Sequence, residues 1–491
     1  MPLSRRDFLA SLAAAPEVLA VDPYRLVSWR RPAPPIRVQG RVTRDGRPLP
    51  RVAVSDGVSV VTTDATGRYT ILADPRMPAV FVCTPANCTL PVSSTGTMLQ
   101  HAPLAGQHEQ RHDFALSAAP ADETRHAFVA LADPQMLDAE DMAAFHATTV
   151  PAVKQAVQML APRSTFGVSV GDILFDRLEM YGDYERAVAL MGIPFAQVVG
   201  NHDLDMNSAT DAGSTATFSR HFGPAWYSFD RGEIHYVVLD DVLWHGQGYI
   251  GHLDAVQLEW LRQDLALVEA ERTVVVFLHM PASSTTPERL ATATTHNWRL
   301  TNAGALWRLL EPFRAHLISG HTHEQEHTVR NDHCHEHNLA TACGAWWTGP
   351  ICWDGTPSGF AVYQADGSAL RWHYQATGRA PSEQLTLHPR GSEPTAPGEI
   401  VANVWNWDPA WTVTWYEGAD RRGVMSRRRG RDPLAVRLFS GTELPPKHRW
   451  VEPLATDHLF YAPAGESHEP IVVEATDRFG VVYRSAALHS G

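Results

Sequence analysis

The stretch that indicates the architecture of this chain most directly is Val199-Gly200-Asn201-His202-Asp203. It stands at the end of an apolar run that begins at Phe195. The run has the character of a buried strand, and the loop after it carries an amide, an imidazole and a carboxylate. In open α/β sheets, ligands bind at the carboxyl ends of the strands, where such loops lie. The stretch therefore predicts a strand that ends in a site for metal and phosphate.

Four more polar stretches follow apolar runs in the same way. They are Leu131-Ala132-Asp133-Pro134-Gln135, Val170-Gly171-Asp172, Phe277-Leu278-His279-Met280 and Gly320-His321-Thr322-His323. Between them, Pro151 opens one candidate helix and Asp254 caps another. We therefore expect mostly buried sheets flanked by helices, with the polar loops converging at one edge.

The order Asp-x-Gln, Gly-Asp, Gly-Asn-His-Asp, His, Gly-His-Thr-His resembles the calcineurin-like metallophosphoesterase superfamily, in particular its three-domain bacterial members. The resemblance implies an α/β (α+β) fold, a four-layer β-sandwich flanked by helices, with a small all-β sandwich domain on each side. It also implies a metal-dependent phosphoric ester hydrolase with two divalent ions.

The pattern of turns, linkers and strands divides the chain into six segments. We expect a signal peptide at 1–20, a linker at 21–35, an N-terminal β-sandwich at 36–118, the catalytic domain at 121–385, a second linker at 386–398 and a C-terminal β-rich domain at 399–491. The first sandwich resembles carboxypeptidase-regulatory or transthyretin-like modules. On this division, residues 121–385 are expected to retain catalysis on small aryl phosphates by themselves.

The resemblance assigns roles to individual residues. Asp172 would bridge the two ions, which the mixture of oxygen and imidazole ligands suggests are Mn, Fe or Zn. The remaining metal ligands would be Asp133, Gln135 and His323 for one ion, and Asn201, His279 and His321 for the other. His202 would be the proton donor or phosphate-binding histidine, with its ring oriented by Asp203. Asp176 is a weaker candidate for support around the bridge.

Two positions depart from the pattern of the family. Gln135 stands where the first motif commonly has histidine, which puts the affinity or the choice of metal at that position in question. Phe175 stands where purple acid phosphatases place a tyrosine ligand, so a coloured Fe³⁺-tyrosinate enzyme is not expected.

Other chemistry-bearing residues have two interpretations each. Trp346, Trp347 and Arg220 are candidates for substrate binding, although core packing explains the tryptophans nearly as well. The tryptophans between 405 and 415 favour sandwich core over a carbohydrate platform, and the arginines 427–429 favour a solvated loop over an anion site. His327, His333, His335 and His337 form a metal site by count, or simply a polar hairpin.

Composition and the N-terminus restrict the class of protein. A net charge of -13 over 491 residues argues against nucleic acid as a partner. The Arg5-Arg6 pair and the alanine-rich stretch after it resemble a twin-arginine export signal, which predicts a periplasmic or extracellular protein. No segment is long and apolar enough for a transmembrane helix. Cys83 and Cys88 are either two half-buried thiols or a loop-closing disulfide.

We therefore expect an exported phosphoesterase that hydrolyses a phosphomonoester or phosphodiester by attack of a metal-bridging hydroxide. Its substrate would be a phosphorylated small molecule or an envelope component, and no oligomeric state is indicated. Two alternatives remain: a nucleotide pyrophosphatase or cyclic-nucleotide phosphodiesterase, and a non-enzymatic envelope-binding protein built on a weakly active scaffold. Gln135 is the residue that favours the second alternative.

Overall fold

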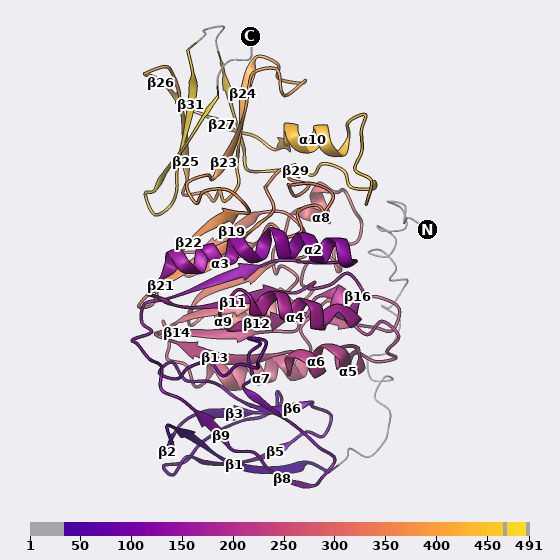
Figure 1. Ribbon diagram of the computed structural model, residues 1–491, viewed down its shortest axis with the longest axis vertical. Coiled ribbons are helices and arrows are strands. Elements are labelled where there is room, and N and C mark those ends of the chain that lie inside the picture. Colours follow the sequence, from indigo (N-terminus) through magenta and orange to yellow (C-terminus); the bar gives the residue numbers. More distant parts are fainter. Residues whose placement is uncertain (1–33, 465–468, 488–491) are drawn as a thin grey trace.

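The computed structural model describes residues 34–464 and 469–487, and it shows three parts stacked along the long axis of the molecule (Figure 1). The predicted signal peptide at 1–20 lies outside these residues. None of the helices in the described part of the chain has the length and apolar character needed to traverse a bilayer.

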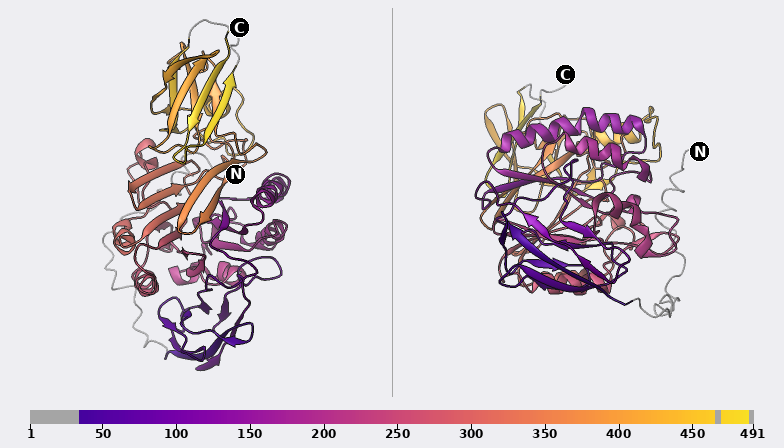
Figure 2. Two further views of the ribbon diagram at one scale, coloured as in Figure 1. Left: turned by 90° about the vertical axis from the view of Figure 1, so that its left-hand side faces the viewer. Right: turned by 60° about the horizontal axis from the view of Figure 1, so that its bottom comes forward.

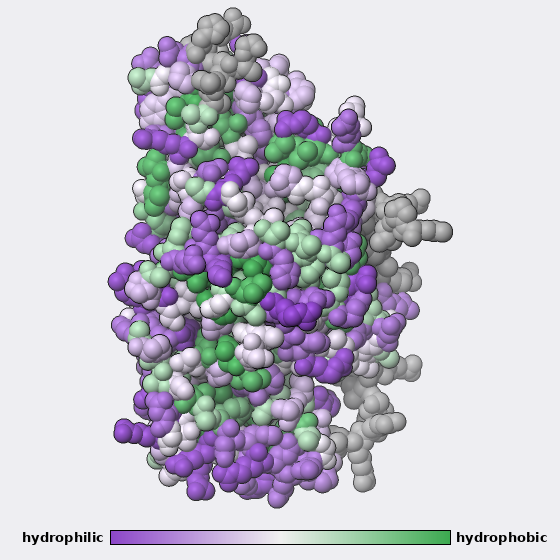
Figure 3. Space-filling model, viewed as in Figure 1, coloured by the Kyte–Doolittle hydropathy of each residue, from purple (hydrophilic) through white to green (hydrophobic). Residues whose placement is uncertain are grey.

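The N-terminal part is a sandwich of two small sheets. One has the order β2-β1-β5 with β8 and β9 paired to β1, and the other has the order β4-β3-β6-β7. The strands are β1 (Ile36–Arg44), β2 (Arg47–Pro48), β3 (Ala53–Ser55), β4 (Val60–Thr62), β5 (Arg68–Ala73), β6 (Ala79–Val82), β7 (His101–Pro103), β8 (Glu109–Arg111) and β9 (Phe114–Leu116). Hydrophilic side chains gather over this end of the molecule (Figure 3). Cys83 and Cys88 are buried free thiols, so no disulfide closes the loop between them.

The central part contains two mixed sheets that face each other. The first has the order β12-β11-β10-β21-β22, and the second has the order β13-β14-β17-β18-β20-β19. The strands of the first sheet are β10 (His126–Leu131), β11 (Ser164–Val170), β12 (Phe195–Val198), β21 (Gly359–Asp366) and β22 (Ala369–Ala376). Those of the second are β13 (Tyr227–Arg231), β14 (Ile234–Val238), β17 (Thr273–Phe277), β18 (Arg314–Ser319), β19 (Glu326–Asn331) and β20 (Cys334–Asn338). A separate hairpin pairs β15 (Val242–Trp244) with β16 (Tyr249–Gly251).

Strand β10 explains why the sequence of the central strands is almost continuously apolar. Its side chains alternate between two cores, since Phe128 and Ala130 pack between the sheets while Val129 and Leu131 pack against the helices. A strand covered on both faces cannot show the polar alternation of a half-exposed strand.

Helices cover the outer faces of both sheets, which gives the predicted four-layer arrangement (Figure 2). The helices are α2 (Ala139–Ala147), α3 (Thr149–Leu160), α4 (Tyr181–Ala189), α5 (Asp211–Ser214), α6 (Ala216–Phe222), α7 (Ala255–Leu265), α8 (Thr286–Arg289) and α9 (Ala303–Leu310), with 3-10 turns η3 (Leu178–Met180) and η4 (Asn201–Asp203). Helix α3 begins just before Pro151, and the Asp254 carboxylate accepts from the Gln257 backbone N–H of α7 as a cap. The predicted fold class is confirmed.

The C-terminal part is a second sandwich. Its sheets have the orders β23-β24-β30-β27 and β26-β25-β31-β32. Its elements are β23 (Leu385–His388), β24 (Glu399–Val404), β25 (Thr412–Glu417), β26 (Asp420–Val424), β27 (Ser426–Arg427), β28 (Gly430–Arg431), α10 (Pro433–Phe439), β29 (Ala455–Thr456), β30 (Leu459–Pro463), β31 (Ile471–Thr476) and β32 (Val482–Ala487). Trp411 and Trp415 lie in its core, as the core-packing interpretation predicted. Arg429 is exposed and paired with Asp457.

Candidate active site

The polar loops meet because the strands that carry them are parallel. β10, β11 and β12 run side by side in parallel in the first sheet, and β14, β17 and β18 do so in the second. Parallel strands present their carboxyl ends at one edge of a sheet. All five predicted stretches therefore open onto the same place.

One group of predicted ligands surrounds Asp172. Its Oδ1 lies 3.3 Å from His279 Nε2, which is in turn 3.0 Å from Asn201 Oδ1 and 3.2 Å from His321 Nδ1. All four residues are buried. One atom from each of Asp172, His279 and His321 lies within 4.8 Å of the others, a spacing at which three side chains could hold one ion.

The other group lies on the opposite side of Asp172. Gln135 Nε2 is 3.1 Å from Asp172 Oδ2, and His323 Nε2 is 3.5 Å from Asp133 Oδ1. The structure thus brings together all seven predicted ligands, in the two groups that the sequence suggested, with Asp172 between them. The role of each as a ligand stays a prediction.

Backbone carbonyls orient the three histidines. His279 Nδ1 lies 2.9 Å from Val170 O, His323 Nδ1 lies 3.0 Å from Gly344 O, and His321 Nε2 lies 2.9 Å from Asn297 O. Since a carbonyl only accepts, each of these nitrogens donates its N–H, and the other ring nitrogen is directed at the cluster. Metal-binding histidines are held in this way.

The loops adopt strained backbone conformations at these positions. Asp133, Gln135, Asp172, His321 and His323 all have φ between 43° and 71°. Residues other than glycine rarely occupy this region, and such strain gathers at functional sites.

His202 lies at the rim of the cluster, and Asp176 orients its ring. His202 Nδ1 donates to Asp176 Oδ1 at 2.7 Å, which leaves Nε2 facing Asp172 Oδ2 at 4.0 Å. Phe175 stacks on the imidazole with a centroid distance of 4.4 Å. Burial would lower the pKa of His202, but the carboxylates of Asp176 and Asp172 outweigh it and raise the pKa to about 9.

The prediction that Asp203 orients the ring of His202 is wrong. The Asp203 carboxylate is fully buried and accepts from the backbone N–H groups of Ile173 and Gly200 and from the Tyr181 hydroxyl. It therefore fastens two ligand loops together. The reason is the helical turn η4, in which neighbouring side chains point in different directions.

The predicted substrate residues do not line an open cleft. Trp346 is buried and stacks on His323 with ring centroids 4.0 Å apart, and the Trp347 indole donates to Pro134 O at 3.0 Å. Arg220 is exposed on α6, and its guanidinium donates to Thr217 of the same helix. The two tryptophans therefore position predicted ligand loops, while Arg220 is not brought to the cluster.

Asp241 is a part of the site that the sequence analysis missed. It is buried, and its carboxylate accepts from the backbone N–H groups of His279 at 2.9 Å and Met280 at 3.0 Å. Burial raises its pKa to about 7. The sequence does carry a signal for Asp241, because Asp240 and Asp241 come soon after the apolar strand β14, just as the five recognised polar stretches follow their apolar runs.

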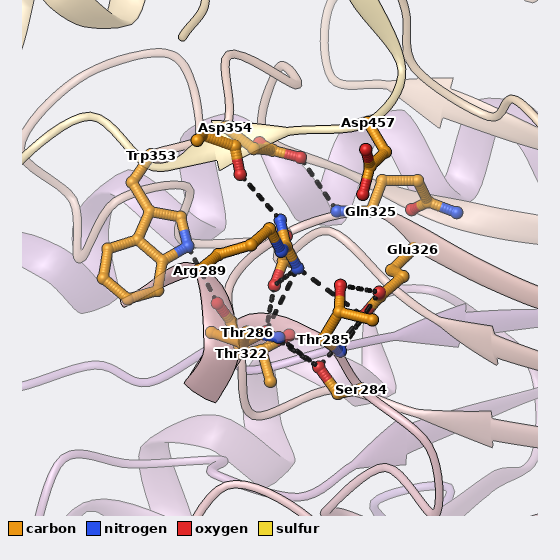
Figure 4. A network of polar contacts seen from close by, with 12 residues as sticks. Ser284, Thr285, Thr286, Arg289, Thr322, Gln325, Glu326, Trp353, Asp354 and Asp457 are labelled. Carbon is orange, nitrogen blue, oxygen red and sulfur yellow. Dashed lines mark hydrogen bonds and ion pairs between the residues drawn. The ribbon is translucent and has the colours of Figure 1, made fainter. Parts of the chain in front are cut away.

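A polar network joins the Gly-His-Thr-His segment to α8 and to the C-terminal part (Figure 4). The Trp353 indole donates to Thr322 O at 2.9 Å, and the Gln325 backbone N–H donates to Asp354 Oδ2 at 2.9 Å. Arg289 of α8 donates to Glu324 Oε1 at 2.6 Å and to Ala455 O at 2.9 Å. The segment that carries two predicted ligands is thus held within the central part and, through Arg289, by the C-terminal part.

A segment of the C-terminal part also reaches the site itself. His448 packs 5.9 Å from the ring of Phe175, and Trp450 packs 4.6 Å from the ring of Trp346. Lys447 beside them is paired with Asp141 of α2 at 2.9 Å. Residues of the C-terminal part thereby support, through Phe175 and Trp346, both the predicted proton donor His202 and the predicted metal ligand His323.

Family models match nearly the whole described chain. Residues 128–325 match the calcineurin-like phosphoesterase model, 36–119 match the N terminal of calcineurin-like phosphoesterase, and 336–483 match its C terminal. The chain belongs to the calcineurin-like phosphoesterase family. Membership classes it with the metal-dependent phosphoester hydrolases.

Individual relatives of this phosphoesterase are more distant. It is 28% identical over 137 residues to the serine/threonine-protein phosphatase CPPED1 of Homo sapiens and 27% identical over 137 residues to that of Pongo abelii. Each match covers 26% of this chain and 43% of the relative, so the chain spans less than half the length of the curated relatives it matches.

Two solved structures are similar to this phosphoesterase. A dimetal phosphatase from Danio rerio has 16% identity and a TM-score of 0.34, covering 51% of this chain and 97% of that one. A purple acid phosphatase from yellow lupin has 14% identity and a TM-score of 0.36, covering 67% of each chain.

The phosphoesterase cluster fits two divalent ions. The Gln135 Oε1 atom is buried with no hydrogen-bond partner among the described residues, as expected of an oxygen that faces a cation. Burial would lower the pKa of His279, yet Asp172 raises it to about 10. The buried carboxylates thus attract positive charge, and the mixture of carboxylate, amide and imidazole groups suits Mn, Fe or Zn.

Proposed function

We propose that the protein is an exported, dinuclear-metal phosphoesterase that hydrolyses a phosphomonoester or a phosphodiester. The observation that carries this proposal is the convergence of seven buried predicted ligand side chains, with Asp172 between the other six and an oriented histidine at the rim. Two ions bound there would supply a hydroxide at neutral pH and neutralise the phosphoryl oxygens. Export is supported by the twin arginines at Arg5 and Arg6.

The chain's own groups account for the remaining steps. The Asp133 and Asp172 carboxylates, the amides and the three histidines would hold the ions. Because the carboxylates of Asp176 and Asp172 raise the pKa of His202 to about 9, the ring is doubly protonated at neutral pH: Nδ1–H donates to Asp176 and Nε2–H is directed toward the cluster. It can therefore protonate the oxygen of the leaving alcohol, which a phosphate ester needs in order to depart. Phe175 and the burial of the ring keep the imidazole in this position.

The nucleotide alternative loses its main support. It required the Trp346-Trp347 loop to stack on a base, but Trp346 is 4% exposed and its ring already stacks on His323. We therefore favour a phosphorylated small molecule or an envelope component as the substrate. The non-enzymatic alternative rested on Gln135, whose side chain lies within the cluster as an amide ligand would.

The proposal is tested by hydrolysis of a paired aryl phosphomonoester and bis-aryl phosphodiester, with the protein loaded with Mn²⁺ or Zn²⁺ and after treatment with a chelator. We expect turnover of at least one substrate, loss of turnover on chelation, and no turnover in Asp172→Asn. The absence of turnover with either substrate and any of these metals would contradict the proposal.

A further inference from the structure

Four histidines form a second cluster between the central and C-terminal parts. His316 lies on β18, His327 on β19, and His335 and His337 on β20. The strand register pairs His316 with His335 and His327 with His337, so all four imidazoles share one face of three adjacent strands. His333, which the sequence grouped with them, is exposed at the hairpin turn and is not part of the cluster.

The ring nitrogens have the spacing of metal ligands. His327 Nδ1 lies 3.1 Å from His335 Nε2, and one nitrogen from each of His327, His335 and His337 lies within 4.8 Å of the others. Tetrahedral Zn²⁺ with bonds of 2.0–2.1 Å to imidazole places its ligand nitrogens about 3.3 Å apart. The metal-free arrangement therefore needs only a small adjustment to close around an ion.

Neighbouring groups fix the rings as a metal site requires. His327 Nε2 lies 2.8 Å from Asn406 Oδ1 and 3.1 Å from Gln325 Nε2, and donation to the nearer Asn406 oxygen leaves Nδ1 facing the cluster as a lone pair. His337 Nε2 lies 3.1 Å from His316 Nδ1. In His335 the nitrogen that faces His327 is Nε2, so Nε2 is the atom that an ion would take.

The nearest positive group is engaged elsewhere. Arg478 Nε lies 2.7 Å from the Asp408 carboxylate, so the charge of the guanidinium is balanced by a carboxylate.

We propose that His327, His335 and His337 bind one further first-row divalent ion, for which Zn²⁺ is the best fit, at a site distinct from the cluster around Asp172. Imidazole is a good ligand for Zn²⁺, and a water in the fourth position completes a tetrahedron. Asn406 follows β24 of the C-terminal part in the chain, and β24 lies in a different part of the molecule from β19 (Figure 1). The ion would thus fasten the hairpin beneath the C-terminal sandwich.

The first test counts ions. The full-length protein is stripped of metal with a chelator, loaded with Zn²⁺, passed through gel filtration and analysed for zinc per chain. We expect His335→Gln/His337→Gln to hold one ion fewer than the wild type, and His333→Gln on the same hairpin to hold the wild-type number. Equal zinc in the wild type and a folded His335→Gln/His337→Gln protein would overturn the proposal.

The second test does not depend on the folding of that double variant. Asp172→Asn removes the predicted bridge of the catalytic cluster and leaves the histidine cluster intact. We expect this variant to retain one Zn²⁺ ion whose X-ray absorption spectrum shows three imidazole ligands, because neither predicted ion position of the catalytic cluster offers more than two. An Asp172→Asn protein without zinc at saturation, or with zinc bound by two imidazoles or fewer, would refute the site, whatever the outcome for hydrolysis.

Discussion

A proton donor must present its N–H at the leaving oxygen, and for His202 this depends on Asp176. Because the Asp176 carboxylate both accepts from Nδ1 and raises the pKa of the ring, Asp176→Asn should lower turnover about 10–100-fold while the metal content stays unchanged. His202→Ala should lower turnover about 10²–10⁴-fold.

The pH profile distinguishes orientation from general damage in Asp176→Asn. The donor is lost as the pH rises through the pKa of His202, so a lower pKa in the variant should move the alkaline decline of kcat to lower pH. Asp203→Asn is the control, since its carboxylate holds backbone N–H groups and its loss should lower Tm instead. An unchanged rate and profile in Asp176→Asn would remove it from the mechanism.

Substitution of Gln135 tests whether its amide side chain weakens the affinity for metal. Gln135→His should tighten binding at one position, because a neutral imidazole is a stronger ligand than an amide oxygen for Zn²⁺. Zinc affinity measured by competition with a chelator gives the answer. If both proteins bind zinc equally tightly, residue 135 does not contact an ion.

For individual residues, the sequence predicted which side chains converge at the site, but not which groups hold those side chains in position. Asp133, Asp172 and His279 could be recognised because each follows its own strand. The role of Asp176 in place of Asp203, and the carbonyl of Asn297 behind His321, depend on how loops distant in sequence meet. Nothing within either loop encodes that meeting.

Among the elements, the loops after β11 and β12 approach each other so closely that only glycine fits between them. A Cβ on Gly200 would meet the backbone nitrogen of Asp172 at 2.0 Å. Gly200→Ala should therefore separate the loops, destabilise the fold by about 1–3 kcal/mol or more, and abolish metal binding. Thermal melting and metal analysis measure both effects.

Gly182 on α4 provides the matched control for this substitution. Its nearest neighbour is the Arg186 guanidinium at 3.6 Å, so Gly182→Ala should leave stability unchanged or raise it by about 0.5–1 kcal/mol. A Gly200→Ala protein that melts and binds metal like the wild type would show that the loops can separate without cost.

A buried charge pair joins β13, β14 and α7 away from the site. Burial would lower the pKa of His235, but the carboxylates of Asp264 and Asp230 raise it to about 9, against about 6.5 in the unfolded chain. The pair therefore stabilises the fold fully below about pH 6.5, by roughly 3 kcal/mol at most, and this is lost as the pH rises through about 9.

His235→Gln should accordingly lower the Tm most at about pH 6, with the difference from the wild type shrinking between about pH 6.5 and about pH 9 and absent at higher pH. Thermal melts across this range measure the effect. His333→Gln, at an exposed position, should show no such dependence. A constant difference between His235→Gln and the wild type would mean that the ring is not charged in the folded protein.

Over the whole molecule, the C-terminal part behaves as a component of the active site. The sequence suggested that residues 121–385 suffice for catalysis, but His448 and Trp450 pack on Phe175 and Trp346. Trp450→Ala should therefore lower kcat about tenfold by loosening the ring that stacks on His323. Assays below the melting temperature measure this.

The control for Trp450→Ala is Trp407→Ala. Trp407 packs on Phe460 within the C-terminal sandwich, so its loss should reduce Tm and leave kcat unchanged. A Trp450→Ala enzyme with wild-type kcat would show that the central part alone determines the activity of the site. The flanking sandwiches themselves were predictable from alternating strands, whereas a contact between an irregular segment and a distant loop has no periodic signal in the sequence.

The reach of Trp450 back to the catalytic centre has a consequence for biosynthesis. A ribosome translates the last predicted ligand, His323, long before it reaches Trp450. A nascent chain therefore possesses every predicted metal ligand before it possesses the residues of the C-terminal part that pack around them. Catalytic competence would arise only near the end of translation, so a truncated product released early would be a poor hydrolase.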